Sequence, residues 1–542
     1  MKKLALALAV VMIFSLAFSG CGPKTETPSA PGADTTGGTE LAVCIGPDPE
    51  TIDPALNSAV DGASLIVHGF EGLMTLDQGG AVVPGQADTY EVSDDGLNWT
   101  FHLRDGLKWS DGQPLTAADF EWSWKRAVSP DTAAPYGEFF NVIAGYDAAA
   151  AGDFDALQVK AEDDQTLTVT LAAPCGYFTQ LLAFPTYVPV RRDMIEANGE
   201  AWATQVSSYI GNGPYKVVEW TPGEYIKYAK NENYWNYDAL GSDTIKFVLI
   251  EDPNAVLTAY QSGEIVCAKD LPSQEIPALR ETEDFHLDDL MGTYYISLNL
   301  NREPFDNLKL RQALSLAIDR NYMANTVMQG TYTPATAFVG PGLLDADGKT
   351  AFIDNSPMFI DPNDYEGNLE KAKQLMVEAG YPNGEGLREI EYFTNQQGYH
   401  KPVAEALQQM WAELGVKLNV QVADWAVVTA DRRQGNYDIA RNGWVFDYND
   451  PSSMLDLFVT TNGNNDGKYS NPEYDKLMET ARTSADANVR FESMHQAEQL
   501  LMDEAGAIPV AFYSEFYLLN PKVKGFWHSP LGYFYFMYAT VE

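Results

Sequence analysis

The stretch NGWVFDYNDP, residues 442–451, places one acid among large aromatic residues, directly after the strand-like run at residues 437–441. This acid, Asp447, is expected to lie in a partly dry place. A charge held there usually requires a cationic partner, because an unpaired buried charge is costly. Arg441, at the other end of the strand-like run, is one candidate, and an ammonium group of a ligand is the other. The alternative is an aspartate that forms the turn before Pro451, since Asp and Asn favour turns.

Residues 443–451 resemble the ligand-binding segment of the oligopeptide-binding proteins of ABC importers, in family 5 of the extracellular solute-binding proteins. The likeness runs from about residue 41 to the C-terminus. Five more motifs stand in the family's order: LKWSDG (107–112), TAADF (116–120), YK (215–216), LSLAIDR (314–320) and SNPEYD (470–475). In that family the aspartate of the segment pairs with the α-amino group of a bound peptide. The resemblance therefore implies this role for Asp447.

The resemblance also implies the fold and its division. We expect an α/β, periplasmic-binding-protein-like fold of type II, cluster C, with two lobes and an additional domain. Lobe I comprises residues 41–70, 192–291 and 515–542. Domain II comprises residues 71–191, and lobe III comprises residues 292–514.

Patterns in the chain agree with α/β lobes. Residues 402–414 show a helical pattern, and the strand-like run 417–422 follows at once. Strands that alternate with helices indicate partly parallel sheets. Thr116, with Asp119 three residues on, predicts a capped helix start, and residues 308–328 form the longest helical pattern. A chain of 542 residues is too long for one core, so at least two lobes are expected.

Residues 1–20 have the layout of a secretory signal peptide: Met-Lys-Lys, an apolar run, then Ser and Gly. Cys21 follows and resembles the acylated cysteine of a bacterial lipobox, although Phe18 stands where leucine is usual. A plain signal peptide with a chance cysteine is the alternative. Residues 21–40 are expected to form the lipidated cysteine and a flexible tether. Two acyl chains anchor stably, which predicts an extracytoplasmic protein on a Gram-positive type of cell membrane.

Charge and cysteines limit the remaining classes. With 76 acidic and 35 basic residues, the chain would repel nucleic acid and anionic membrane surfaces. Cys44, Cys175 and Cys267 are far apart and lack metal or redox spacing, so we expect buried free thiols. In some relatives a disulfide joins the aspartate segment to a neighbouring strand. The corresponding positions here are Val445 and Gly292, so that bridge is absent.

The family match extends to further ligand-contacting positions, although a lone Trp, Tyr or Arg equally fits packing or a surface ion pair. The resemblance implies that backbone groups at one position and aromatic rings at others contact the peptide, and that cations at different depths meet its carboxylate. The backbone and aromatic positions are Val60, Tyr136, Trp425, Trp444, Tyr448 and Tyr513. The carboxylate-binding candidates are Arg432, Arg441 and His400.

Signatures of catalysis and of cofactors are missing from the sequence. Neither HExxH nor GxSxG occurs, and the phosphate-loop pattern at residues 342–350 has the wrong spacing. One weak metal pattern remains, since a calcium loop has ligands at the spacing of Asn462, Asn464, Asp466 and Glu473. The alternative is a polar loop in which Asn471 caps a helix that begins at Pro472. We therefore expect no metal, no cofactor and no enzyme.

These observations predict a monomeric, lipid-anchored receptor that closes two lobes over an extended oligopeptide and delivers it to the permease of an ABC importer. Main-chain hydrogen bonds would then supply affinity without reading side chains. The nearest alternative is a relative of the same fold that binds a nickel chelate, an oligosaccharide or a signalling peptide. A secreted hydrolase is the alternative of another class, and it requires a nucleophile beside a base.

Overall fold

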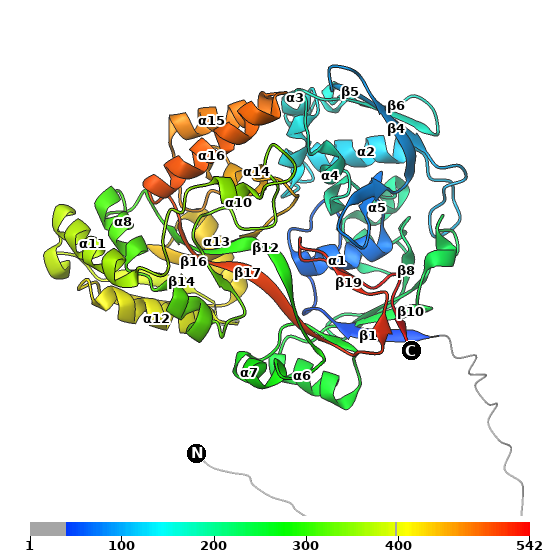
Figure 1. Ribbon diagram of the computed structural model, residues 1–542. Helices are drawn as coiled ribbons and strands as arrows, with labels where there is room; N and C mark the ends of the chain where they lie inside the picture. Colours follow the sequence, from blue (N-terminus) through cyan, green and yellow to red (C-terminus); the bar gives the residue numbers. More distant parts are fainter. Residues whose placement is uncertain (1–38, 396–397) are drawn as a thin grey trace, which may run out of the picture. The chain divides into compact units, whose positions relative to one another are not determined.

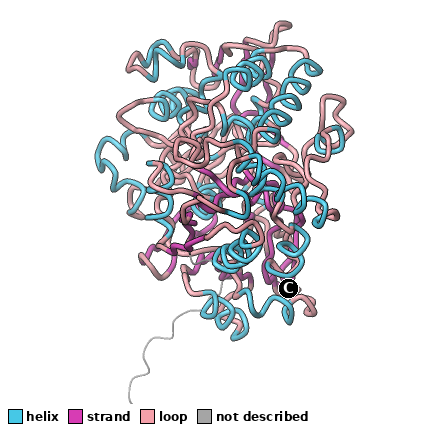
Figure 2. The backbone as a smooth tube through the Cα atoms, turned by 90° about the vertical axis from the view of Figure 1, so that its left-hand side faces the viewer, coloured by secondary structure: helices cyan, strands magenta, loops and turns pink. Residues whose placement is uncertain are grey.

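A large sheet organises the computed structural model, which describes residues 39–395 and 398–542 and, for residues 425 and 426, the backbone alone. Its eleven strands include ten in the order β15-β14-β16-β12-β17-β11-β1-β10-β9-β8, and β13 pairs with β17. The strands run through the middle of the described chain, with helices and loops around them (Figure 2). The strands are β1 (Glu40–Cys44), β8 (Tyr215–Thr221), β9 (Tyr225–Lys230), β10 (Thr244–Val248), β11 (Cys267–Ala268), β12 (Phe285–Leu298), β13 (Thr333–Pro334), β14 (Ile390–Thr394), β15 (Leu418–Val422), β16 (Ile439–Val445) and β17 (Ile508–Leu519).

The two longest strands, β12 and β17, run antiparallel from one half of the sheet into the other (Figure 1). In one half β1 pairs in parallel with β10 and β11, and in the other β14 pairs in parallel with β15 and β16. The predicted α/β class and partly parallel sheets are confirmed. The register of β12 and β17 shifts between Asp289 and Thr293, where the predicted boundary between lobes I and III falls. The boundaries themselves remain a prediction, and lobe I, domain II and lobe III are names for the predicted residue ranges.

Lobe I carries few helices, and the C-terminal segment completes it. Its helices are α1 (Val60–Gly69), α5 (Arg192–Asn198), α6 (Pro253–Ser262) and α7 (Ile276–Leu279). Gly263 ends α6 in a left-handed conformation, φ 78°, which glycine adopts without a steric penalty. Two short antiparallel pairs follow β17: β18 (Val523–Lys524) with β21 (Thr540–Val541), and β19 (Trp527–His528) with β20 (Phe534–Tyr535).

Domain II contains an antiparallel sheet of its own, in the order β4-β5-β7-β6. The Thr116 backbone N–H donates to the Asp119 carboxylate at 2.8 Å, which confirms the predicted start of α2. Phe120 and Trp124 of α2 are fully buried. Its elements are β2 (Met74–Leu76), β3 (Val82–Pro84), β4 (Ala87–Val92), β5 (Asn98–Leu103), α2 (Ala117–Val128), α3 (Tyr146–Ala150), β6 (Val159–Ala161), β7 (Thr166–Thr170) and α4 (Phe178–Leu181).

Lobe III holds the remaining helices, which pack on both faces of its part of the sheet. The predicted single helix over residues 308–328 is wrong. The helix stops at Leu316, and Asp319 caps a new turn by accepting the N–H of Tyr322 at 2.8 Å. The helices are α8 (Leu308–Leu316), α9 (Arg320–Tyr322), α10 (Phe352–Asn355), α11 (Tyr365–Glu378), α12 (His400–Ala412), α13 (Trp425–Gln434), α14 (Ser452–Leu455), α15 (Pro472–Thr483) and α16 (Ala487–Asp503).

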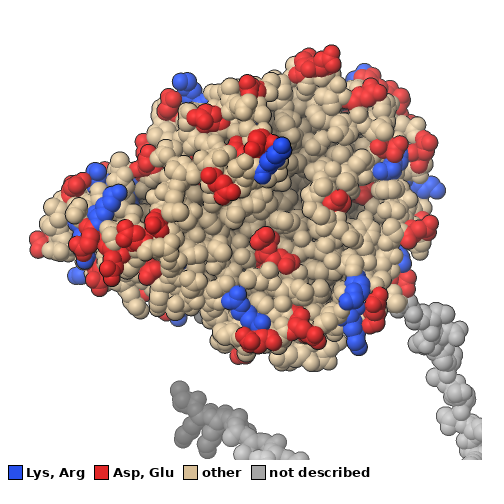
Figure 3. Space-filling view, in the orientation of Figure 1, with Lys and Arg blue, Asp and Glu red and all other residues tan. Residues whose placement is uncertain are grey.

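The predictions about cysteines and charge meet a mixed outcome. Cys44 and Cys267 are buried free thiols, whereas Cys175 is only partly buried. Gly292 and Val445 are cross-strand partners in β12 and β16, so the two positions do face each other without a disulfide. Acidic side chains outnumber basic ones on the face drawn in Figure 3. Within residues 39–395 and 398–542, no helix combines the length and apolar character needed to span a bilayer.

The predictions for the first residues cannot be placed on this fold. The signal peptide at residues 1–20, Cys21 and nearly all of the tether at residues 21–40 lie outside the described residues, which begin at Thr39.

Candidate binding site

Asp447 lies two residues beyond β16, in a loop that brings lobe III against domain II. Its carboxylate accepts the Tyr136 hydroxyl of domain II at 2.9 Å and the Trp444 indole N–H at 3.2 Å. Its backbone N–H donates to the Ser453 hydroxyl at 2.8 Å. The residue is therefore held from three sides, and both hydrogen bonds to its carboxylate come from neutral groups.

Burial governs the electrostatics of Asp447. Among the residues that the structure describes, no Lys, Arg or His forms an ion pair with it. Burial raises the pKa of Asp447 to about 7, against the hydrogen bonds from Tyr136 and Trp444 that lower it, and the charge of Glu138 raises it further. A carboxylate in such a place favours a positively charged group that comes from outside.

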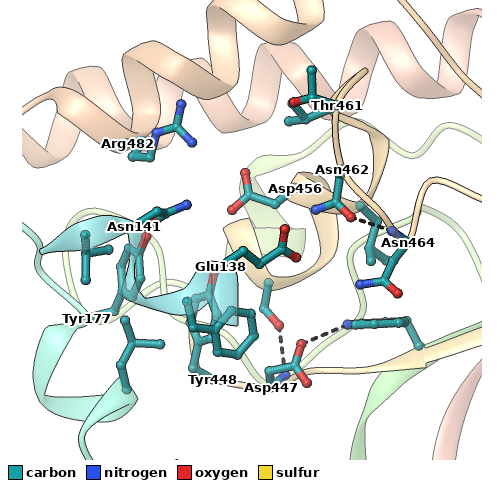
Figure 4. A pocket seen from close by; sticks show the side chains of 17 residues that line it. Glu138, Asn141, Tyr177, Asp447, Tyr448, Asp456, Thr461, Asn462, Asn464 and Arg482 are labelled. Carbon is teal, nitrogen blue, oxygen red and sulfur yellow. Dashed lines mark hydrogen bonds between the residues drawn. The ribbon is translucent and has the colours of Figure 1, made fainter. Parts of the chain in front are cut away.

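A cavity of about 140 Å³ borders Asp447 (Figure 4). Domain II and lobe III both contribute to its wall. The rings of Tyr177 and Tyr448 stack at 4.8 Å within this wall, with an interplanar angle of 7°. The polar and charged lining residues are Glu138, Asn141, Asp447, Ser453, Asp456, Thr461, Asn462, Asn464 and Arg482.

Arg441 forms a second charged centre, near the start of β16. Its Nη2 donates to the Tyr513 hydroxyl at 3.1 Å, and its guanidinium lies over the Tyr294 ring at 5.3 Å. The His400 ring lies 5.6 Å from the same Tyr294 ring. Burial and the charge of Arg441 lower the pKa of His400 well below its ordinary value. The lowered pKa keeps the His400 ring uncharged beside a permanent cation, and its buried Nδ1 has no hydrogen-bond partner among the described residues.

Of the other predicted ligand contacts, Tyr136 lies beside Asp447, whereas Val60 contacts neither Asp447 nor Arg441 in any interaction described above. Tyr136 packs on Phe139 and Phe184, with ring centroids 4.8 and 4.9 Å apart, and so lies at the Asp447 end. Val60 is the first residue of α1 and is partly exposed. The Trp425 side chain lies outside the described residues.

Arg432 stands apart from the carboxylate-binding candidates. Its Nε pairs with the Asp466 carboxylate at 2.6 Å, and both side chains are buried. Its Nη1 also donates to the Arg441 carbonyl at 3.2 Å. The arginine therefore has a partner within the fold, which the sequence did not reveal because the pair is separated by a turn, a strand and two short helices.

The polar loop before α15 follows the helix-cap alternative rather than the calcium pattern. The Asn471 side chain accepts the N–H of Glu473 at 2.9 Å, and Pro472 is the first residue of α15. Asp466, which the calcium pattern requires as a ligand, binds a guanidinium instead. Asn462 accepts the N–H of Asn464 at 2.8 Å. Across the described part of the chain, no group of three His, Cys, Asp or Glu side chains is placed to hold a metal.

Two acids of the cavity were missed from the sequence. Asp456 interrupts the apolar run MLDLF at residues 454–458, an arrangement like the one that singled out Asp447, so the same rule applied again would have found it. Burial raises its pKa to about 7. Glu138 follows Tyr136 by two residues, and burial raises its pKa as well. No local pattern marks Glu138.

Comparisons with known proteins agree with this geometry. The family model for bacterial extracellular solute-binding proteins, family 5 Middle, matches residues 81–466. The chain is 34% identical to the oligopeptide-binding protein OppA of Bacillus subtilis (strain 168) over 550 residues, 99% of each protein. It is also 34% identical over 496 residues to the probable deoxycholate-binding periplasmic protein YgiS of Escherichia coli (strain K12), 90% of this chain and 91% of that one.

A solved structure extends the likeness to three dimensions. The crystal structure of Haemophilus influenzae OppA in complex with RPPGFSPFR matches with a TM-score of 0.82 at 30% identity, and covers 93% of this chain and 99% of that one. The expected type II two-lobe fold is thereby confirmed. These relatives are solute-binding proteins rather than enzymes. The chain belongs to family 5 of the bacterial extracellular solute-binding proteins.

Proposed function

We propose that this protein captures extended oligopeptides through their free α-amino group and delivers them to the permease of an ABC importer. One observation carries the assignment: Asp447 is an enclosed carboxylate that the described chain supplies with neutral hydrogen-bond donors and with no counter-charge. The α-ammonium group of a peptide provides both the charge and the donors that such an acid favours. Arg441 and His400, near the other end of β16, are the groups proposed for the peptide's carboxylate.

The spacing of the two centres suits a short peptide. Asp447 lies six positions after Arg441, and extended chain rises by about 3.3 Å per residue, so roughly 20 Å is the upper limit of their separation along the strand. A peptide of at most about six extended residues spans that distance. Peptides of this class bind with main-chain hydrogen bonds that do not depend on side chains, and a broad range of sequences is the expected consequence.

Calorimetry with paired peptides tests the proposal. An alanine peptide with a free N-terminus is titrated into the native protein beside the same peptide with an acetylated N-terminus. The free peptide is expected to bind more tightly by roughly two to four powers of ten, the effect of losing one member of a buried charge pair at about 3–5 kcal/mol. Equal affinity of the two peptides would make Asp447 a turn former. Mass spectrometry of ligands released from freshly purified protein identifies the natural set.

The anchor is a separate part of the proposal, and it rests on the sequence of residues 1–40. Cys21→Ala should release the protein from membranes into the soluble fraction, because two acyl chains provide the stable attachment. A Phe18→Leu variant is the matched control, since it moves the segment toward the usual lipobox and should remain membrane-bound. Unchanged retention of the Cys21→Ala variant would contradict lipidation.

A second candidate, a non-peptide solute, is favoured by the likeness to YgiS, whose name refers to deoxycholate. The stacked rings of Tyr177 and Tyr448 provide an apolar wall that a sterol-like solute would also contact. Deoxycholate carries a carboxylate and no amine, so Asp447 would repel it. Titration of deoxycholate under the same conditions separates the two candidates: heat of binding for deoxycholate and none for the free peptide would favour the second.

The hydrolase alternative requires a nucleophile beside a base, and the structure contains a serine, a histidine and an aspartate in contact. Ser356 Oγ lies 3.0 Å from His495 Nδ1, and His495 Nε2 lies 2.9 Å from Asp345. The same hydroxyl lies 3.0 Å from the Glu498 carboxylate, which accepts the backbone N–H groups of Phe338 and Val339. These contacts tie a loop to α16, and none of these side chains lines the cavity beside Asp447. The group therefore fits a structural role.

A further inference from the structure

The cavity beside Asp447 carries more negative charge than one α-ammonium group neutralises. Its lining includes three carboxylates, on Glu138, Asp447 and Asp456, and one cation, Arg482. Arg482 already pairs with Glu479, one turn away on α15. In Figure 4 the carboxylates of Glu138 and Asp456 extend into the space that also borders Asp447. We call this space the acidic cavity.

Glu138 and Asp456 are unpartnered. Neither carboxylate accepts a hydrogen bond or forms an ion pair within the described residues. Asp456 is partly buried and lines the acidic cavity. Burial raises the pKa of both groups, which means that their negative charge is poorly compensated in the chain alone.

A structural acid of the same protein shows the contrast. Glu71 is buried, and its carboxylate accepts the Tyr234 hydroxyl at 2.6 Å, the Trp235 indole N–H at 2.7 Å and the Gln86 amide at 2.6 Å. An acid that serves the fold is therefore given donors. The two extra acids of the acidic cavity have none, so their charge calls for a group outside the chain.

The walls and the size of the acidic cavity define that group further. Phe139, Tyr177, Leu181 and Tyr448 line it with apolar surface, which suits the methylene stem of a long basic side chain whose charged head reaches the carboxylates. Its volume is about 140 Å³, and an engineered protein cavity of roughly 150 Å³ holds benzene. A lysine side chain, with fewer heavy atoms than benzene, fits that volume.

We infer that the acidic cavity binds the cationic side chain of the ligand's first residue, so that peptides beginning with lysine or arginine are preferred. This inference rests on the proposed function, because the same residue places its α-ammonium group on Asp447. Glu138 belongs to the range predicted for domain II and Asp456 to the range predicted for lobe III, so two parts of the chain that are far apart in sequence supply the two acids. The preference therefore depends on both parts of the fold being closed on the peptide.

The test compares two matched series of peptides, lysine followed by one to eight alanines and norleucine followed by the same alanines. Norleucine keeps the length of the stem and removes only the charge. Calorimetry on the native protein is expected to show lysine-first peptides binding at least about tenfold more tightly, an effect of about 1.4 kcal/mol or more. Asp456→Asn and Glu138→Gln should each reduce that ratio toward one. Norleucine-first peptides should still bind each variant, so the ratio within a variant, and not the absolute affinity, is the quantity compared.

Glu473→Gln is the control variant. Glu473 is an exposed acid on α15, outside the acidic cavity, and it tests whether the preference comes only from the net charge of −41. The ratio should stay unchanged in this variant and at raised salt concentration, because long-range attraction between exposed charges is screened. The inference would be overturned if the ratio of affinities for lysine-first and norleucine-first peptides were the same in Glu473→Gln and Asp456→Asn.

The outcomes for the two proposals are distinguishable. If both series bind the native protein equally well, the inference about the first side chain is wrong and peptide capture stands. If neither series binds at any length, both proposals fail. Binding of the norleucine-first series to Asp456→Asn and Glu138→Gln also shows that the variants are folded, so a lost preference in them reports the missing charge.

Discussion

Asp447 and Asp450 lie three residues apart in one loop, yet the protein surrounds the two carboxylates differently. Asp450 accepts from both terminal nitrogens of Arg490, at 2.7 and 2.6 Å, and both residues are buried. Asp447 accepts only from the neutral donors of Tyr136 and Trp444. The chain thus supplies Asp450 with a counter-charge and Asp447 with neutral donors alone, which is the difference expected if Asp447 is kept for the ammonium group of a ligand.

Two more acids of the same region, Asp466 and Asp438, are paired with an arginine as Asp450 is. Asp466 pairs with Arg432 at 2.6 Å. Asp438 accepts from Arg388 at 2.5 and 2.8 Å, and although burial alone raises its pKa, this guanidinium holds the pKa below its ordinary value. The pKa of Asp447, in contrast, rises to about 7. The difference between these acids therefore comes from their immediate partners and not from the acidic composition of the chain.

The largest effect is expected from Asp447→Asn. The affinity for a peptide with a free N-terminus should fall by roughly two to four powers of ten, because the peptide's ammonium group loses a charged partner in an enclosed place. The free energy of unfolding of the ligand-free variant should not decrease, since the substitution removes an uncompensated buried charge. Calorimetry measures the first quantity and urea denaturation the second.

A double-mutant cycle shows whether the carboxylate and the ammonium group meet each other. Native protein and Asp447→Asn are each titrated with free and acetylated peptide. Because each change destroys the same contact, the two losses should not add. Additive losses would mean that Asp447 acts on the peptide indirectly.

Asp450→Asn should reverse the pattern. This substitution leaves the buried guanidinium of Arg490 without its partner, so the free energy of unfolding should fall by about 3 kcal/mol. The peptide affinity of the folded fraction should stay near the native value, because Asp450 is not a lining residue of the acidic cavity. Denaturation in urea and calorimetry below the unfolding transition give the two numbers. A loss of affinity as large as that of Asp447→Asn would remove the distinction between the two acids.

Local signals predicted much of the fold. Thr116 and Asp119 mark the start of α2, and Gly263 marks the end of α6, because capping depends on residues a few positions apart. The prediction of one long helix over residues 308–328 was wrong because a local cap competes with it. The apolar spacing is continuous, but Asp319 caps a new turn. A pattern that supports two local structures is decided by the packing around it.

The surroundings of Asp447 were predictable only where the signal lies within one segment. The neighbouring residues show no adjacent cation but left Arg441 open as its partner, and the Tyr136 hydroxyl that Asp447 accepts comes from 311 positions away. The resemblance named Tyr136 and Arg432 alike as ligand contacts, and could not tell that Arg432 has Asp466 as a partner. Long-range pairs of this kind depend on the tertiary fold, which residue spacing does not encode.

Peptide affinity should also depend on pH. Asp447 must be ionised to pair with an ammonium group, and its pKa in the ligand-free protein is about 7. Each pH unit below 7 therefore costs about tenfold in affinity, or roughly a hundredfold between pH 7 and pH 5. Above about pH 8 the α-amino group of the peptide loses its charge, so affinity should be highest near pH 7 to 8.

Acetylated peptide provides the control for this pH profile, because it has no ammonium group to gain or lose. Glu138 and Asp456 titrate in the same cavity with raised pKa values, so the profile should be measured with a norleucine-first peptide, whose side chain does not respond to them. A flat profile for the free peptide between pH 5 and pH 7 would contradict a direct role of Asp447. The contribution of Asp447 to the stability of the ligand-free protein should rise as pH falls through about 7, since a raised carboxyl pKa means that the folded state binds the proton more tightly.

A smaller effect is expected from substitutions of Arg441 and Arg432. The two variants should differ in how peptide affinity depends on peptide length. Arg441→Gln should weaken by about tenfold the lengths whose carboxylate reaches it, because a guanidinium matches a carboxylate in geometry and charge. Arg432→Gln should instead lower stability through Asp466 and affect all lengths equally. A calorimetric series over two to nine residues measures both. Equal losses across all lengths in Arg441→Gln would make this arginine structural as well.

The smallest expected effect comes from Tyr136→Phe. The ring stays packed on Phe139 and Phe184, so the variant removes only the hydroxyl that donates to Asp447 across the contact of domain II and lobe III. One lost hydrogen bond of about 1 kcal/mol should weaken the free peptide roughly fivefold. The midpoint of the pH profile should also move upward, because the hydroxyl lowers the pKa of Asp447. Tyr187→Phe is the matched control: its hydroxyl donates to the Phe139 carbonyl at 2.8 Å within domain II, so this variant should lose stability and keep both the affinity and the pH midpoint. If the two variants behave alike, the hydroxyl of Tyr136 supports the fold of domain II and not the charge of Asp447.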